Sequence, residues 1–300
     1  MGTIVSFHAH PDDESIGTGG TLARAADAGH RVVLVFATRG ELGEPVPGVL
    51  AEGEQLSLRR TAETYESAKV LGVHRVEFLG YTDSGMIGLD TNDVPWCFWQ
   101  ADVDQAARRL AVILEEEHPD VVTIYDDHGG YGHPDHIQVH RVGKRAAELA
   151  GVSVVAQGTM NRDLMARAMA RAQEMGVDVP EDVVEEFADA GGDPEGADVD
   201  TEAAAAGTAT RRGPPQIDRS TFGTPEAGLT HMVDTVAVLD RKRASMLAHG
   251  SQIGPDHFMA SMPAEAFAYV FGSEWFMVDD MPAGDAPALF TELFAPLHTG

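Results

Sequence analysis

The sequence is poor in cysteine and in basic residues, and both shortages exclude classes of protein. Cys97 is the only cysteine, so neither an intrachain disulfide nor a metal site built from several thiolates can form. Lysine and arginine number 21 against 48 aspartate and glutamate residues, a formal net charge of −27 over 300 residues. A chain of this charge repels phosphate backbones, and we expect no nucleic-acid partner.

Long apolar runs are also missing. No window reaches the roughly 20 apolar residues of a membrane-spanning helix, and the first residues show no basic stretch followed by a long apolar one. We therefore expect no membrane partner and a cytoplasmic protein. Hydrophobic residues make up 43% and charged residues 23% of the chain, a balance typical of a globular protein that buries a core.

The first half of the chain alternates short apolar runs with segments of helical spacing. Strands are expected at residues 3–7, 31–37, 76–79 and 121–125, and helices at residues 21–28, 58–71 and 103–117. Repeated strand–helix–strand units favour parallel pairing with right-handed crossovers. The prediction is an α/β fold: a Rossmann-like, open, mainly parallel sheet with helices on both faces and a smaller C-terminal subdomain.

The pattern is weaker after residue 150. A further strand is expected at residues 152–155, and further helices at residues 162–175, 229–248 and 264–271. Residues 188–213 are rich in Ala, Gly and Asp without periodicity, which predicts a mobile or poorly ordered insertion. We divide the chain into a metal-binding catalytic core (1–155), a divergent, partly irregular insertion (156–228) and a C-terminal segment that completes the core (229–300).

Two polar clusters follow predicted strands. Residues 8–14 read His-Ala-His-Pro-Asp-Asp-Glu. Residues 125–136 contain three aspartates and histidines before a Gly-rich turn and three more after it. The carboxyl ends of parallel strands form the ligand crevice of an open α/β sheet, so we expect the clusters to face each other. Adjacent carboxylates are costly to bury unless they meet a cation. Imidazole and carboxylate without sulfur match a catalytic zinc site or non-haem iron(II).

These clusters resemble the PIG-L or LmbE-like family of zinc-dependent N-deacetylases. The resemblance rests on residues 10–14, 83–86 and 129–136. It is greatest to the mycothiol-pathway branch, which contains an N-acetyl-glucosaminyl-inositol deacetylase and a mycothiol S-conjugate amidase. Residues 242–252 are also similar to the family, and their His249 and Gln252 could reach the site or a subunit interface. Residues 159–225 show no such similarity.

The resemblance implies a role for each residue of the two motifs. His10, Asp13 and His136 would hold zinc, with iron(II) as the alternative, and Asp12 would be the general base. This division suits neighbouring carboxylates, because one has its lone pairs committed to the metal while the other stays free to accept a proton from bound water.

The resemblance also implies groups that act on the substrate carbonyl. Tyr131 and His133 would stabilise the developing oxyanion, or His133 would act as the general acid. Asp135 would orient His133. Tyr131 is expected to be mobile because glycines surround it.

Contacts to the sugar are implied at four further positions, Glu44, Arg60, Asp83 and Met86. Charged side chains suit sugar hydroxyl groups, because charge-assisted hydrogen bonds are strong. The plainer alternative makes Arg60 and Glu63 an exposed i, i+3 pair on a helix.

Several neighbouring residues have plainer explanations too. His8 is expected to pack behind the site, and His140 to lie on a helix surface. The aromatic run at residues 96–99 either covers the pocket or packs in the core. Residues 17–20 lack the spacing of a phosphate-binding loop, and we expect them to allow close helix packing.

The resemblance implies an amidohydrolase that uses metal-activated water to remove the N-acetyl group of an N-acetylglucosamine-type substrate, such as a glucosaminyl-inositol. The alternatives are a mycothiol S-conjugate amidase, a deacetylase of a glycosylated secondary metabolite, and a metal- or sugar-binding protein without turnover. An uncommitted base beside complete ligands argues against the last, because a binding site has no use for it. We expect a small-molecule amino-sugar partner and leave a homo-oligomer open.

Overall fold

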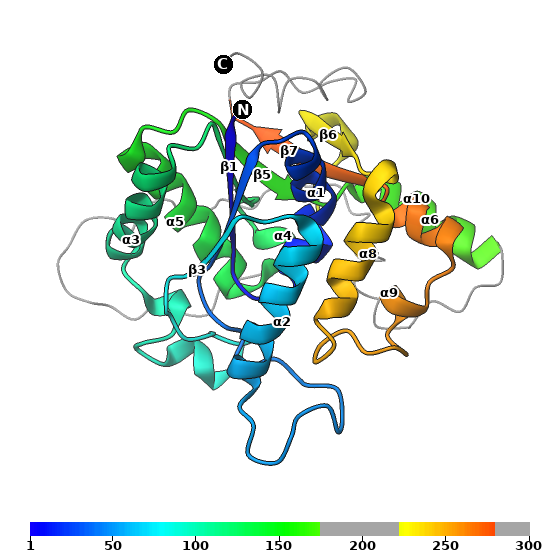
Figure 1. Ribbon diagram of the computed structural model, residues 1–300, viewed down its shortest axis with the longest axis horizontal. Coiled ribbons are helices and arrows are strands. Elements are labelled where there is room, and N and C mark those ends of the chain that lie inside the picture. The colour runs from blue at the N-terminus through cyan, green and yellow to red at the C-terminus, as the bar shows by residue number, and fades with distance from the viewer. Residues whose placement is uncertain (175–221, 280–300) are drawn as a thin grey trace.

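The structure is a computed structural model that describes residues 1–174 and 222–279. Its described strands form one sheet in the order β3-β2-β1-β4-β5-β7-β6 (Figure 1). The strands are β1 (Thr3–His8), β2 (Arg31–Phe36), β3 (Arg75–Phe78), β4 (Val121–Tyr125), β5 (Val155–Thr159), β6 (His231–Asp234) and β7 (Ser273–Val278). β1 to β5 are parallel, whereas β7 pairs antiparallel with β5 and β6. The predicted open, mainly parallel α/β sheet is confirmed.

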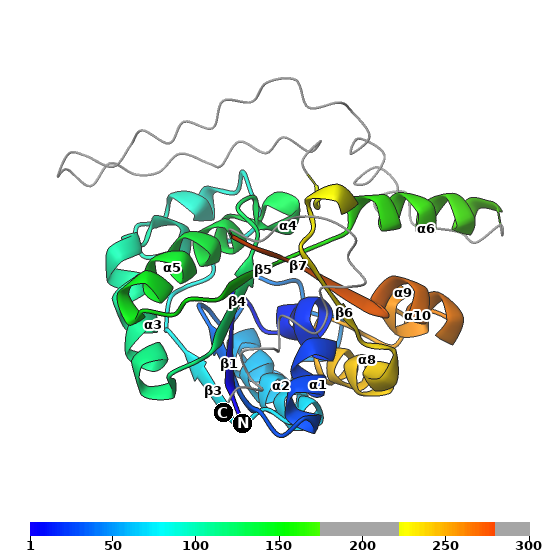
Figure 2. The ribbon, with the colours of Figure 1, turned by 90° about the horizontal axis from the view of Figure 1, so that it is seen from above.

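Helices cover both faces of this sheet (Figures 1 and 2). One face carries α1 (Gly19–Asp27) and α2 (Leu56–Leu71), with α8 (Leu239–Ala248) packed on both; the other carries α3 (Val103–Glu117) and α5 (Pro134–Ala150). Along β1, Ile4 packs on the α1 side and Val5 on the α3 side, and neither is exposed. Burial on both faces explains the continuous apolar runs of these strands.

The remaining elements are short or lie at the margin of the sheet. They are the π-helical turn η1 (Glu14–Thr18), α4 (Gly129–Gly132), α6 (Arg162–Glu174), α9 (Phe258–Ser261) and α10 (Ala264–Phe271). Figure 2 shows α6, α9 and α10 beyond the β6 edge. Met246, Ile253 and Phe267 form a small apolar cluster of their own in this region.

Two expectations for the second half are wrong. The strand expected at residues 152–155 is β5, which begins only at Val155. The helix expected at residues 229–248 is helical only from Leu239, because β6 occupies its first part and pairs with β7. Sheet pairing therefore outweighs the helical spacing of these apolar residues. Residues 188–213 lie outside the described residues, and the division into three regions stays a prediction.

A buried ion pair connects the C-terminal strands to the start of α1. Glu274 on β7 accepts hydrogen bonds from two backbone N–H groups of α1, each at 2.7 Å, and from Lys242 Nζ on α8 at 2.7 Å. A side chain at Gly20 would collide with Thr235, so only glycine permits this approach. The close helix packing expected for the glycine-rich segment is confirmed at Gly20.

Candidate metal centre and active site

The two polar clusters meet at the carboxyl edge of the sheet. β1 and β4 are neighbouring strands, so the loop that follows β1 and the α4–α5 segment that follows β4 lie side by side. Ring nitrogens of His10, His133 and His136 all lie within 4.8 Å of one another, and the three side chains are buried. This His cluster, with the Asp13 carboxylate described next, can hold a metal ion.

Asp13, the third ligand implied by the family resemblance, lies close to two of these histidines. Its Oδ2 lies 3.4 Å from His10 Nδ1 and 3.4 Å from His136 Nε2. Zinc–nitrogen and zinc–oxygen bonds of about 2.1 Å place neighbouring ligands of a tetrahedral ion about 3.4 Å apart. Asp13 Oδ2 therefore lies at a distance from each of the two histidine nitrogens that suits neighbouring ligands of one divalent ion.

In His10 and in His136, one ring nitrogen lies within hydrogen-bond distance of a protein oxygen atom. The other ring nitrogen, which faces Asp13, is left available to a metal. His10 Nε2 donates to Asp135 Oδ2 at 3.1 Å, which leaves Nδ1 facing Asp13. His136 Nδ1 lies 3.3 Å from the Gly129 carbonyl oxygen, and its buried Nε2 has no hydrogen-bond partner among the described residues. A ring nitrogen that donates elsewhere fixes the tautomer of a metal-binding histidine.

The electrostatic potential at His10 also favours a cation. Burial lowers the pKa of His10, but the carboxylates of Asp83, Asp13 and Asp135 outweigh burial and raise this pKa well above its usual value. The negative potential that stabilises a proton on the ring stabilises a divalent cation in the same place.

The predicted pairing of Asp135 with His133 is wrong. The Asp135 carboxylate binds His10 and accepts hydrogen bonds from the backbone N–H and the hydroxyl of Ser84. His133 is the N-cap of α5, and its Nδ1 accepts a hydrogen bond from the Asp135 backbone N–H at 3.1 Å. Capping turns the His133 ring back onto its own helix, so Asp135 is left to orient the metal ligand. Ser84 lies in the segment 83–86 on which the family resemblance rests, but no role was predicted for it.

Asp12 lies next to the cluster with its carboxylate free of His10 and His136. Arg60 Nη2 donates to Asp12 Oδ2 at 3.0 Å, and 17% of the Asp12 side chain is exposed. Burial raises the pKa of Asp12 to about 6, although the Arg60 guanidinium opposes the rise. A carboxyl group with this pKa is mostly ionised at neutral pH and still able to take a proton, as a general base must be.

The two candidate groups for the substrate carbonyl stand on the other side of the cluster. The His133 ring centroid lies 4.6 Å from that of His10, and the Tyr131 centroid lies 5.0 Å from that of His136. Burial, and the neighbouring His10 and His136, hold the pKa of His133 well below its usual value. Gly130 has φ 71° and ψ −75°, a conformation open to glycine alone, next to Tyr131.

Comparison with known proteins gives the family of a chain with this site. The family model PIG-L, described as GlcNAc-PI de-N-acetylase, matches residues 5–147. The 1D-myo-inositol 2-acetamido-2-deoxy-alpha-D-glucopyranoside deacetylase of Thermobifida fusca is 42% identical over 261 residues, 83% of each chain. The protein of the same name from Acidothermus cellulolyticus is 38% identical over 295 residues, 94% of this chain and 91% of that one. The chain belongs to the PIG-L family.

A solved structure agrees with the fold of this PIG-L member. N,N'-diacetylchitobiose deacetylase from Pyrococcus horikoshii superposes with a TM-score of 0.56 at 20% sequence identity, over 97% of this chain and 88% of that one. The family and fold expected from the motifs are confirmed, and PIG-L relatives that span most of the chain are named as hydrolytic deacetylases. In the described ranges, no helix is long and apolar enough to cross a membrane.

Tyr125 is a residue of the site that the sequence reasoning missed. Its ring stacks on His136 with centroids 4.2 Å apart and an angle of 4° between the planes. Its hydroxyl accepts a hydrogen bond from the Ala9 backbone N–H at 3.2 Å. Tyr125 therefore holds the ligand ring of α5 against the loop after β1. Tyr125 is the last residue of β4, at the carboxyl edge of the sheet, and this position was the signal that could have predicted its place in the site.

The four predicted sugar contacts fall in different places. Asp83 is buried 3.5 Å from His10 Nε2, and its oxygens accept backbone hydrogen bonds. Arg60 is buried and donates to the carbonyls of Pro11 and Gly40 as well as to Asp12. Glu44 and Met86 are exposed on loops. The contacts with sugar stay predictions at all four positions.

The plainer explanations have mixed outcomes. Arg60 and Glu63 are not an exposed pair, because both are buried and Glu63 accepts two hydrogen bonds from Ser251. His8 is buried behind the site and bonded to Thr18, as expected. In the run 96–99, Trp96 is 70% exposed while the next three residues are buried, so most of the run packs in the core.

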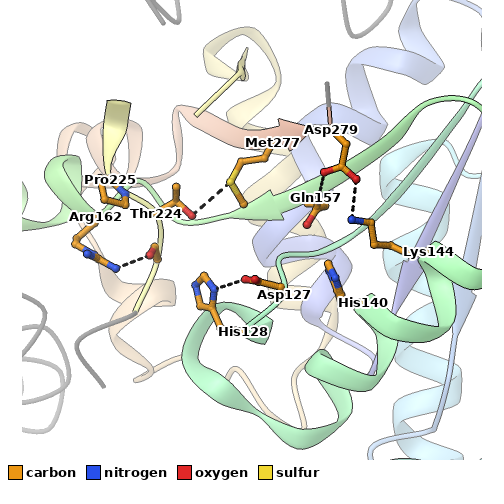
Figure 3. Close-up of a pocket in the computed structure, with 11 residues that line it drawn as sticks. Asp127, His128, His140, Lys144, Gln157, Arg162, Thr224, Pro225, Met277 and Asp279 are labelled. Atoms are coloured by element: carbon orange, nitrogen blue, oxygen red, sulfur yellow. Dashed lines mark hydrogen bonds and ion pairs between the residues drawn. The ribbon is translucent and has the colours of Figure 1, made fainter. Parts of the chain in front are cut away.

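A cavity of about 510 Å³ is lined in part by Asp127 and His128 of the second polar cluster, and Figure 3 shows its lining residues. His140 lines it, with its Nδ1 held at 3.0 Å from the Tyr125 carbonyl oxygen. The charged side chains around it pair with one another: His128 with Asp127 at 2.9 Å and Lys144 with Asp279 at 2.7 Å. None of the three proposed metal ligands lines this cavity.

Proposed function

We propose that the chain is a metal-dependent amidohydrolase that removes the N-acetyl group from an N-acetylglucosamine-type substrate, a glucosaminyl-inositol or a related glycoside. The observation that carries the proposal is the Asp13 carboxylate, which lies 3.4 Å from His10 Nδ1 and 3.4 Å from His136 Nε2, with Asp12 beside it and paired with Arg60 instead. The names of the two relatives support the substrate class.

Zinc is the proposed metal, with iron(II) as the alternative. Many catalytic zinc sites have three protein ligands, such as two imidazoles and one carboxylate, and an open position for water. Iron(II) accepts the same ligands. A bound ion would supply Lewis acidity, which lowers the pKa of a water molecule and polarises the acetamide carbonyl. A cytoplasmic location and a homo-oligomer stay predictions.

In the proposed reaction, Asp12 takes a proton from the attacking water and later delivers it to the leaving nitrogen. Arg60 holds the Asp12 carboxylate in place through the hydrogen bond at 3.0 Å. His133 accepts the Asp135 backbone N–H at Nδ1, so its neutral ring carries the proton on Nε2. That N–H and the Tyr131 hydroxyl are the donors we assign to the developing oxyanion.

The test is a substrate panel measured for released acetate and free amine. We expect acetate from N-acetylglucosaminyl-inositol, and none after the metal is removed with a chelator. Amine released from a mycothiol S-conjugate without acetate would favour the amidase instead. Acetate released only from an N-acetylated glycosylated metabolite would favour a deacetylase of such metabolites over one of glucosaminyl-inositol. No release from any of the three, by protein with one metal per chain, would contradict the proposed function.

A further inference from the structure

Asp12 has a backbone conformation that its residue type disfavours. Its φ is 99°, and in the described part of the chain His118 is the only other non-glycine residue with positive φ. His118 ends a helix, where the left-handed conformation is common. Asp12 lies within the site, and such strain persists only where the surrounding structure holds it in place.

Glu14 holds the strained residue. Its Oε2 accepts the Asp12 backbone N–H at 2.9 Å. Its Oε1 accepts hydrogen bonds from the hydroxyls of Ser15 at 2.8 Å and Ser67 at 2.6 Å, and from His249 Nε2 at 2.6 Å. The Glu14 side chain is fully buried, and all four donors point at one carboxylate. Glu14 therefore does not extend the ligand set of the His-Pro-Asp-Asp motif.

His249 reaches this carboxylate from the far end of the chain. It stands 235 positions after Glu14, at the C-cap of α8, and its ring has no exposed surface. α8 packs on α2, which supplies Ser67. A histidine of the C-terminal segment thus touches the group that fixes the backbone of the proposed base.

We propose that His249 and Glu14 are a positioning pair for Asp12. The inference rests on the proposed function, in which Asp12 is the base. His249 fixes the Glu14 carboxylate, Glu14 fixes the Asp12 N–H, and the positive φ of Asp12 aims its side chain past the ligands. Neither residue of the pair touches the ligand atoms of His10, Asp13 or His136, so the pair acts on the base and leaves metal binding intact.

The test compares His249→Leu, which removes the ring donor, with Ser251→Ala. Ser251 lies in the same segment and donates to Glu63 in place of Glu14, so it is the matched control for anchoring. We expect His249→Leu to lower kcat about 10- to 100-fold, as a misplaced catalytic group does, with KM and one metal per chain unchanged. His249→Gln, which keeps an N–H donor, should recover part of the loss. Ser251→Ala should behave as the unaltered chain.

A readout without substrate completes the test. In the crystal structure of metal-loaded His249→Leu, we expect Asp12 to leave positive φ or its carboxylate to turn from Arg60. An unchanged Asp12, or an equal loss of kcat in His249→Leu and Ser251→Ala, would overturn the pairing. If His249→Leu does not fold, Glu14→Gln takes its place with the same expected results. If the unaltered chain releases no acetate, the proposed function is contradicted but the positioning of Asp12 is not. The conformation of Asp12 in the crystal structure of the variant still tests that positioning.

Discussion

His136 offers the cluster a single nitrogen, because its other ring nitrogen is held by the Gly129 carbonyl. His136→Ala should therefore lose the metal, since two of three protein ligands are too few to hold it tightly. His140→Ala, one turn further along α5 and outside the ligand cluster, is the control and should keep it. Elemental analysis after dialysis measures both. Full metal content in His136→Ala would rule out this ligand set.

In the proposed mechanism Asp12 is the base and binds no metal, whereas its neighbour Asp13 is a metal ligand. Asp12→Asn keeps the size of the side chain and removes the basic oxygen. We expect the metal content to stay at that of the unaltered chain and kcat to fall by about 10²- to 10⁴-fold, the contribution of a positioned base. Near-normal turnover would show that another group removes the proton. Rate and metal content are measured on the same preparation.

The meeting of the two polar clusters could be predicted because each cluster is a short motif that directly follows a strand. A strand that stops at a run of His and Asp places them at the carboxyl edge, and neighbouring strands bring the runs together. The partners of Ser84 and His249 could not be predicted. Both residues lie in family-like segments, but the resemblance does not show which side chain, remote in sequence, each of them contacts. Asp135 was assigned to the wrong histidine because sequence spacing does not show which way a capping ring turns.

At the scale of elements, the parallel strands β1 to β4 were predictable, whereas β5 was misplaced and the antiparallel strands were missed. β1, β2 and β4 are buried along almost their whole length, so each is mainly apolar, with Ser6 and Thr123 as polar residues inside β1 and β4. β6 has only four residues at the sheet edge, with burial on alternate positions. Its apolar residues also fit the helical spacing of α8, so the sequence allows either a strand or a longer helix. Pairing with β7 favours the strand.

Three elements meet at the edge of the sheet opposite the site. Glu117, at the end of α3, binds Arg31 of β2 at 2.5 Å and Arg75 of β3 at 2.9 Å. Hydrogen bonds from Arg31, and then from Arg75, lower the pKa of Glu117 from 4.5 to about 2, although burial opposes them. A lowered folded-state pKa means that this stability is fully present above about pH 4.5 and is lost as pH falls toward 2.

Glu117→Gln tests that contribution. We expect the free energy of unfolding to fall by about 1–2 kcal/mol at pH 7, and the difference from the unaltered chain to shrink below pH 4.5. Glu116→Gln is the control, because Glu116 is more than half exposed in its ion pair with Arg75 and exposed pairs contribute little. Urea denaturation at several pH values measures both. A difference that stays constant down to pH 2 would contradict the assignment.

Across the whole molecule, residues near the N-terminus depend on contacts from beyond residue 230. Glu274 binds α1 across 254 positions, and His249 binds Glu14 across 235. The sheet order places β7 next to β5 and β6 next to β7, so the C-terminal strands extend the sheet that carries the site. We therefore expect the described part of the chain to unfold cooperatively, with the site lost together with the C-terminal contacts.

The buried pair of Lys242 and Glu274 tests this dependence, because removing the charge of one partner should cost more stability than removing the charge of the other. Glu274→Gln leaves the Lys242 ammonium without an anion, since Nζ donates to no other side chain among the described residues, and such a charge costs about 3–5 kcal/mol of stability. Lys242→Met should cost less, because Glu274 keeps its two backbone donors at the N-terminus of α1, where a negative charge is favoured. Urea denaturation at neutral pH measures both variants. A larger loss in Lys242→Met would show that the lysine, and not the helix terminus, holds the Glu274 carboxylate.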